Sequence, residues 1–420
     1  MTTPTRLERN LTGILDDLSA GPTPEYLDDL FMRTGRMRQR PAWTFPERWL
    51  PMSDITRSRA FAFAPPWRTI ALVLVVIALL AGAAFAYVGS QRRVPAPFGP
   101  AANGLIVYDN GGDIYTGDPV TGQERLVVSG KDFDAARGFS PDGTLIAFIR
   151  QSGQDGDLYT ARSDGTGVKR ITTTPIPLDT WIQWTPDSQH FAVIRGVDGH
   201  DRLDVLDLNG QARRLAGDFD VQAPMFRPLL AQEILFRGLK DGRAGLFVMN
   251  ADGSNIRTVI ASSKPDTLDL RGATYSPDGK RIFYQSWTPA GIEPQGCCQL
   301  WVMDADGSNA HQFPDDRKTN AWEGVPAVSP DGRWVAFWRV TDTRHASVVR
   351  ADGTGPVTPV GPELSGLVTY TWSPDSSKLL IAPAEDIDVA RQYIADPVTG
   401  QWTTSEWATR TSPDWQRQAP

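Results

Sequence analysis

The chain holds only four histidines and two cysteines, and the two cysteines stand out because they are adjacent. Cys297 and Cys298 lie in the longest insertion between apolar runs, residues 286–299. Adjacent Cα atoms are about 3.8 Å apart, below the usual disulfide range of about 4.4–6.8 Å, so a ring closed here is strained. Three states fit the pair: a vicinal disulfide formed outside the cell, two free thiols, or a bridge between chains.

Patterns typical of catalytic and metal sites are missing from the sequence. None of the four histidines is spaced as His-x-x-x-His or His-Glu-x-x-His, and no Gly-x-Ser-x-Gly elbow occurs. Asp304-Ala305-Asp306-Gly307 looks like the start of a calcium loop, but no Glu stands at the twelfth position. The same turn recurs in register at Asp252 and Asp352. We therefore predict no catalytic residue, no metal, no cofactor and no enzymatic activity.

The elements that position these residues follow from a turn that recurs along the chain. An aromatic or apolar residue is followed by Ser-Pro-Asp or a variant of it, and the prolines of successive copies lie 39 to 53 residues apart. The prolines of the seven copies are Pro141, Pro186, Pro228, Pro277, Pro330, Pro374 and Pro413. A near-constant period in this range indicates a stacked array of small units.

Each unit reads as several short strands joined by tight turns. Apolar runs such as Leu145–Ile149 and Val335–Trp338 have the length of strands, not of helices. Asp-Gly and Asn-Gly pairs between the runs favour tight hairpins. No unit can bury its faces alone, and radial stacking into a β-propeller solves that problem. We predict an all-β, seven-bladed propeller, with six blades as the alternative. The segment around Trp415 is expected to supply the strand that the first hairpin, Gly104–Val128, lacks.

Two stretches of one unit carry a family resemblance. Tyr275–Ile282 and Leu300–Asn309 resemble the WD40-like propeller repeats of the TolB type. The resemblance implies that residues 103–420 form the propeller. It says little about activity, because propellers serve as scaffolds, receptors and enzymes alike.

Residues 69–88 are predicted to form a single transmembrane helix. They carry no charge, and about 20 residues at about 1.5 Å each cross the roughly 30 Å of hydrocarbon. Residues 1–68 contain ten arginines, which places the N-terminus in the cytoplasm and the propeller outside the cell. Residues 89–102 are rich in proline and are expected to act as a tether.

The segment 1–68 is predicted to be a short helical cytoplasmic tail. Leu27, Leu30 and Phe31 fall on one face of its second helix, and Trp43 and Trp49 follow. So small a segment needs a partner or the membrane surface to cover its apolar side chains. These five residues are therefore candidates for docking a cytoplasmic protein. Alternatively, Trp43, Phe45 and Trp49 lie in the headgroup region, with the arginines on anionic lipid.

The order of tail, single span and outer domain resembles the layout of membrane-bound anti-sigma factors. That resemblance implies a cytoplasmic regulator similar to a sigma factor as partner. The zinc-binding class of those proteins has a Cys/His motif, and residues 1–68 contain neither Cys nor His.

Charge argues against one large class of partners. The net charge is −7 with acids and bases interspersed, so no basic stripe for nucleic acid is expected. We predict a non-enzymatic module in the cell membrane that binds a protein or a small ligand at the propeller loops, with signalling through the tail as a further expectation. The alternatives are an envelope scaffold of the TolB kind and an enzyme with a site in the propeller channel.

Overall fold

The computed structural model describes residues 71–78, 98–172, 175–178, 180–228, 232–262, 270–287, 298–314, 321–364, 367–384, 390–409 and 412–419. The chain divides into two units, Met1–Ala86 and Tyr87–Pro420. In the first unit, residues 71–78 are helical and exposed. Among the residues described, no helix combines the length and the apolar character that a membrane crossing requires. The remainder of the predicted span and the whole predicted tail lie outside the described residues.

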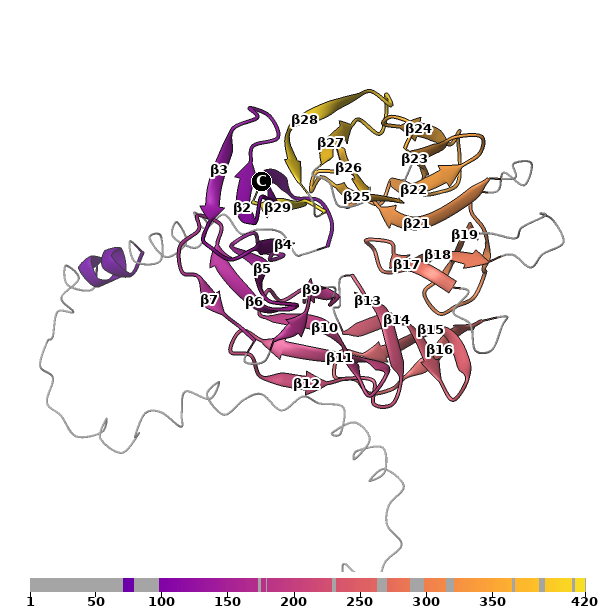
Figure 1. Ribbon diagram of the computed structural model, residues 1–420, viewed down its shortest axis with the longest axis horizontal. Helices are drawn as coiled ribbons and strands as arrows, with labels where there is room; N and C mark the ends of the chain where they lie inside the picture. Colours follow the sequence, from indigo (N-terminus) through magenta and orange to yellow (C-terminus); the bar gives the residue numbers. More distant parts are fainter. Residues whose placement is uncertain are drawn as a thin grey trace, which may run out of the picture. The chain divides into compact units, whose positions relative to one another are not determined.

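The second unit is a ring of seven antiparallel sheets, which we call blades 1 to 7 (Figure 1). Blade 1 consists of β29 (Asp414–Gln418), β1 (Ala102–Asn110), β2 (Asp113–Gly117) and β3 (Glu124–Val128). Blade 2 consists of β4 (Asp134–Phe139), β5 (Leu145–Ser152), β6 (Asp155–Arg162) and β7 (Lys169–Arg170), with β8 (Ile176–Pro177) also paired to β6. Blade 3 consists of β9 (Ile182–Trp184), β10 (His190–Val197), β11 (His200–Asp207) and β12 (Ala212–Arg214).

The other four blades repeat this order. Blade 4 consists of β13 (Asp220–Phe226), β14 (Glu233–Lys240), β15 (Arg243–Asn250) and β16 (Arg257–Ala261). Blade 5 consists of β17 (Leu270–Tyr275), β18 (Arg281–Trp287), β19 (Cys298–Asp304) and β20 (His311–Gln312). Blade 6 consists of β21 (Trp322–Val328), β22 (Trp334–Val340), β23 (Arg344–Arg350) and β24 (Thr358–Val360). Blade 7 consists of β25 (Leu367–Trp372), β26 (Leu379–Ala384), β27 (Ala390–Ala395) and β28 (Trp402–Thr409). The all-β, seven-bladed prediction is confirmed, and the six-bladed alternative is wrong.

The last strand closes the ring on the first hairpin, as expected. β29 pairs with β1, and Trp415 lies opposite Ile106. The Trp415 side chain is buried in a cluster that includes Tyr108 and Trp407. Blade 1 therefore takes its innermost strand from the C-terminal end of the chain and its other three strands from the start of the propeller.

The seventh copy of the recurring turn is not a turn of the same kind, and that prediction was wrong. In the other copies the proline follows the first strand of a blade, whereas Pro413 precedes β29. Asp414 is the first residue of that strand, and its Oδ2 accepts a hydrogen bond from the Phe139 amide of blade 2 at 2.8 Å. The tripeptide is the same, but here the carboxylate joins two blades.

The other copies are turns between the first two strands of a blade. Hydrogen bonds within the turn and to the next blade fix them, as the β4–β5 turn shows. In the β4–β5 turn the Ser140 hydroxyl donates to Asp142 at 2.5 Å and accepts from the Leu145 amide at 2.9 Å. The Asp142 amide donates to the hydroxyl of Ser188 in blade 3 at 3.1 Å. The aromatic side chains that precede the turns are buried, as expected of core residues; they are Phe139, Trp184, Phe226, Tyr275 and Trp372. We call the end of the ring that carries these turns the turn end.

Residues just before β1 contact blades that lie across the ring from one another. Phe98 packs against the core cluster shared by blades 3 and 4. The Gly99 carbonyl accepts from Arg417 Nη1 in blade 1 at 2.9 Å, and the Ala101 amide donates to the Pro374 carbonyl in blade 7 at 2.9 Å. The chain therefore enters β1 at the turn end with its last residues already bound to the propeller.

Closure places one carboxylate in an unfavourable position. A Cβ built on Gly138 would lie 2.6 Å from Asp414 Oδ2, so only glycine leaves room there. Burial raises the pKa of the Asp414 carboxyl to about 6, although the amides of Phe139 and Trp415 and the charge of Arg417 oppose the shift. An unfolded aspartate titrates at about 3.9. Because the folded pKa is the higher one, the fold favours the protonated form, and this group lowers stability as the pH rises from about 4 to about 6.

We predict that Asp414→Asn raises the free energy of unfolding at about pH 7.5 and raises it clearly less at about pH 4.5. The amide oxygen can still accept from Phe139 without a buried charge. Urea unfolding at both pH values measures the difference, with Asp155→Asn at the exposed start of β6 as the control for loss of one charge. A variant that is less stable than the wild type at the higher pH contradicts the prediction.

Candidate functional site

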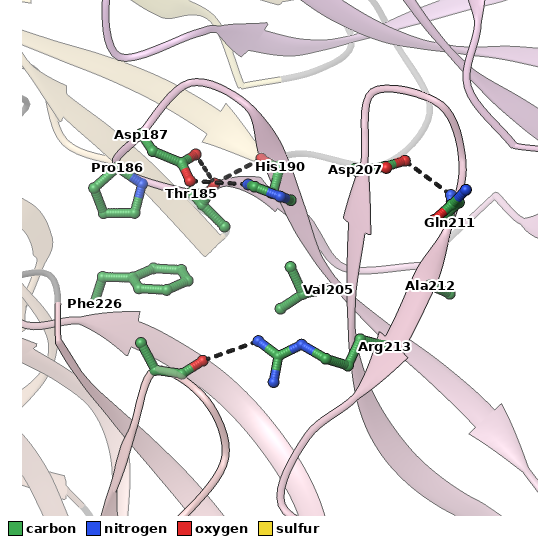
Figure 2. Close-up of a pocket in the computed structure, with 11 residues that line it drawn as sticks. Thr185, Pro186, Asp187, His190, Val205, Asp207, Gln211, Ala212, Arg213 and Phe226 are labelled. Carbon is green, nitrogen blue, oxygen red and sulfur yellow. Dashed lines mark hydrogen bonds and ion pairs between the residues drawn. The ribbon is translucent and has the colours of Figure 1, made fainter.

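A groove at the turn end between blades 3 and 4 brings several ionisable side chains together (Figure 2). Its volume is about 420 Å³. It is bounded by the β9–β10 turn, by β11, β12 and their connection, by the end of β13 and by the β15–β16 turn. We call it the blade 3–4 groove.

A threonine, an aspartate and a histidine meet on one wall of the groove (Figure 2). The Thr185 hydroxyl donates to Asp187 Oδ1 at 2.6 Å, and His190 Nδ1 lies 2.8 Å from Asp187 Oδ2. A nucleophilic triad requires the hydroxyl to bond to the histidine, which in turn bonds to the acid. Here both side chains bond to the acid, so the histidine does not activate the hydroxyl.

The electrostatics of Asp187 fit a structural carboxylate. Burial alone would raise the pKa of its carboxyl, but hydrogen bonds from Thr185, the Gln189 amide and His190 outweigh burial and hold the pKa below its usual range. The carboxyl is therefore ionised at neutral pH and stabilises the β9–β10 turn. Ser188, the next residue, takes a positive φ of 59°, as Ser376 does in the blade 7 turn, where three other copies have glycine.

The opposite wall is built in the same way. Asp207 Oδ1 accepts from the amides of Asn209 and Gln211 at 2.8 and 2.9 Å, and these bonds hold the pKa of Asp207 below its usual range. Arg213 Nη1 donates to the Asp252 carbonyl of blade 4 at 2.8 Å. The arginine thus bridges the two blades across the groove.

The floor between these walls is apolar. Val205, Ala212 and Phe226 line it, together with Pro186 (Figure 2). The charged groups at the rim are already hydrogen-bonded within the turns or to the next blade, and the exposed lining combines this polar rim with the apolar floor. Such a surface suits the side chain of a binding partner better than a reacting substrate.

The cysteine pair is only half described. Cys298 begins β19 and is buried, and Cys297 lies outside the described residues. A disulfide between Cys297 and Cys298 therefore stays a prediction. The predicted docking residues of the tail, Leu27, Leu30, Phe31, Trp43 and Trp49, also lie outside the described residues.

The four histidines lie apart from one another: His190 and His200 are at opposite ends of the β10–β11 hairpin of blade 3, His311 is in blade 5 and His345 is in blade 6. His200 Nδ1 lies 3.0 Å from Asp220 Oδ1, and His311 Nδ1 lies 2.7 Å from the Asn309 carbonyl. His345 Nε2 lies 3.1 Å from the Thr343 hydroxyl. Within the part of the chain that the structure describes, no three His, Cys, Asp or Glu side chains are grouped as metal ligands would be.

Comparison with known proteins identifies the repeats. Residues 180–355 match the model of the TolB beta propeller domain. This part of the propeller is similar to the TolB beta propeller. This match covers blades 3 to 6 for the most part, including both walls of the groove.

Curated relatives are distant and of mixed kinds. The uncharacterized peptidase YuxL of Bacillus subtilis is 25% identical over 221 residues, which is 50% of this chain and 30% of that protein. The uncharacterized protein Atu1656 of Agrobacterium fabrum is 26% identical over 208 residues, 48% of this chain and 68% of that protein. The chain thus spans less than a third of the length of the first relative.

A solved structure shows the same fold in an enzyme. The oligogalacturonate lyase from Vibrio parahaemolyticus superposes with a TM-score of 0.52 at 12% identity, over 73% of this chain and 84% of that chain. At this identity the likeness concerns the fold alone.

Proposed function

We propose that this TolB-type propeller is a non-enzymatic binding module that holds another protein in the blade 3–4 groove. One observation carries the proposal: Asp187 and Asp207 are fully used in holding turns, while Val205, Ala212 and Phe226 form an open apolar floor. A reaction needs a polar group directed at a substrate, whereas a docking partner needs a cavity for an apolar side chain and polar groups at the rim.

The proposed occupant is a protein segment because the same kind of groove recurs around the turn end. A second depression of about 310 Å³ lies between blades 6 and 7. It is formed by the equivalent turns and includes Trp334, Asp375 and Val398. An extended partner that follows the turn end can reach more than one such groove, which favours a protein over a small ligand.

We predict that Ala212→Glu abolishes capture of the partner. A glutamate at this exposed position would fill part of the groove and compete with the apolar side chain of the partner for the floor, and we expect binding to weaken by at least about ten-fold, or about 1.4 kcal/mol. Cross-linking in cells followed by purification of the full chain and quantification of the captured proteins measures the loss. The matched control is Val197→Glu, an exposed valine at the end of β10, on the opposite end of the ring from both depressions.

Two results would count against the blade 3–4 groove. One is an unchanged set of captured proteins in Ala212→Glu. The other is cleavage of a peptide or polysaccharide by the purified chain that is lost in His190→Ala, which would make the groove an active site. Thermal unfolding of Ala212→Glu shows whether the fold is intact.

We further propose that residues 69–88 anchor the propeller outside the cell and that the tail contacts a cytoplasmic regulator. The uncharged run and the arginines before it support this arrangement. Deletion of residues 1–60 is expected to remove the tail's partners from membrane co-purification and to leave the groove's partners in place. If the full and the shortened chains recover the same proteins, the tail does not signal.

We predict that alkaline phosphatase is active when fused after Pro420 and inactive when fused after residue 60, because its disulfides form only outside the cytoplasm. Phosphatase activity per amount of fusion protein, measured in intact bacteria, reads out the side of the membrane. The reverse pattern, or equal activity of both fusions, contradicts the proposed orientation.

A further inference from the structure

A third depression, separate from the blade 3–4 groove and from the one between blades 6 and 7, lies on blade 4, at the end of the ring opposite the turn end. Its volume is about 560 Å³. It is lined by Phe219, Lys240, Asp241, Arg243, Ala244, Phe247, Thr258 and Ala261. None of these residues belongs to the blade 3–4 groove, so the two sites can be tested independently.

The floor of this depression is a group of packed phenylalanines. The Phe219 ring lies edge-on to Phe247 with centroids 5.0 Å apart, and Phe236 lies behind both at 5.7 and 5.6 Å. A Cβ on Gly238 would lie 2.8 Å from Phe236 and 3.0 Å from Phe247. Glycine at this position therefore allows the rings to pack closely, and the result is a rigid aromatic surface.

Two cations stand side by side at the rim. Lys240 and Arg243 are directly opposite each other in the β14–β15 ladder, so both side chains project from the same face of the sheet. Like charges in this position destabilise a hairpin. Among the described residues neither cation forms an ion pair, and the Lys240 ammonium lies 5.1 Å from the centroid of the Phe219 ring. Asp241, which also lines the depression, is exposed in the turn between them.

The unfavourable pair and the aromatic floor point to the same ligand. An anion placed between Lys240 and Arg243 would relieve their repulsion, and an apolar body attached to it would cover Phe219 and Phe247. We propose that this depression binds a small organic carboxylate with an aromatic or other flat apolar group. The carboxylate lies between the two cations, and the apolar group lies on the phenylalanines.

Isothermal titration of the full chain with 1-naphthoate tests the proposal. We expect saturable binding to the wild type and at least about ten-fold weaker binding to the double variant Lys240→Gln/Arg243→Gln. The uncharged probe 1-naphthalenemethanol should also bind at least about ten-fold more weakly than naphthoate to the wild type. The matched control Lys131→Gln/Lys280→Gln removes the same charge from exposed positions in other blades and should bind naphthoate as the wild type does.

A second variant protects the test from misfolding. Thr258→Trp keeps both cations and fills the depression from its exposed rim, and we expect it to weaken naphthoate binding as well. Equal affinity of wild type and double variant for naphthoate, or equal affinity of the wild type for the acid and the alcohol, overturns the proposal. Ala212→Glu should leave naphthoate binding unchanged, so failure of the blade 3–4 groove and failure of this site are distinguishable.

Discussion

The pairing of β29 with β1 is the contact on which the rest of the propeller depends. Each blade buries its faces only against its neighbours, so an open ring would expose the faces of two blades at once. Trp415 packs with Ile106 and Tyr108 of blade 1 and with Leu380 of blade 7. The same strand reaches blade 2 through the bond from Phe139 to Asp414. One short strand therefore connects three blades, and its first residue carries a buried carboxyl whose pKa is raised to about 6.

The two ends of the ring differ in how their charged side chains are bonded. The turn end carries carboxylates that are bonded into turns, as Asp142 and Asp187 are, and it also receives the chain through Phe98 and Gly99. The other end carries the β14–β15 turn, where Lys240 and Arg243 face each other and, among the described residues, form no ion pair. We infer protein docking at the first end and binding of a small anion at the second because of this difference in electrostatics.

The fold could be predicted from the sequence because its determinants are local. Ser-Pro-Asp turns depend on a few neighbouring residues, and their period implies stacking. The closing role of the Trp415 segment followed from counting strands. The copy at Pro413 was misread because the same tripeptide can precede a strand as well as follow one. The candidate sites were missed because they depend on packing between blades and on strand register: the blade 3–4 groove forms only where Arg213 of blade 3 meets the Asp252 turn of blade 4, and the Lys240–Arg243 pair follows from the register of β14 and β15.

Amide hydrogen exchange of the purified chain tests the closed ring most directly. We predict that the amides of β29 exchange as slowly as those of β14 and β22, and that the amides of Ile106 and Val107, which lie opposite β29, do the same. All of these amides become exposed to solvent only when the whole ring opens. Exchange of β29 within minutes while β14 and β22 stay protected would show that the C-terminal strand opens by itself. That result would contradict a ring closed by this pairing.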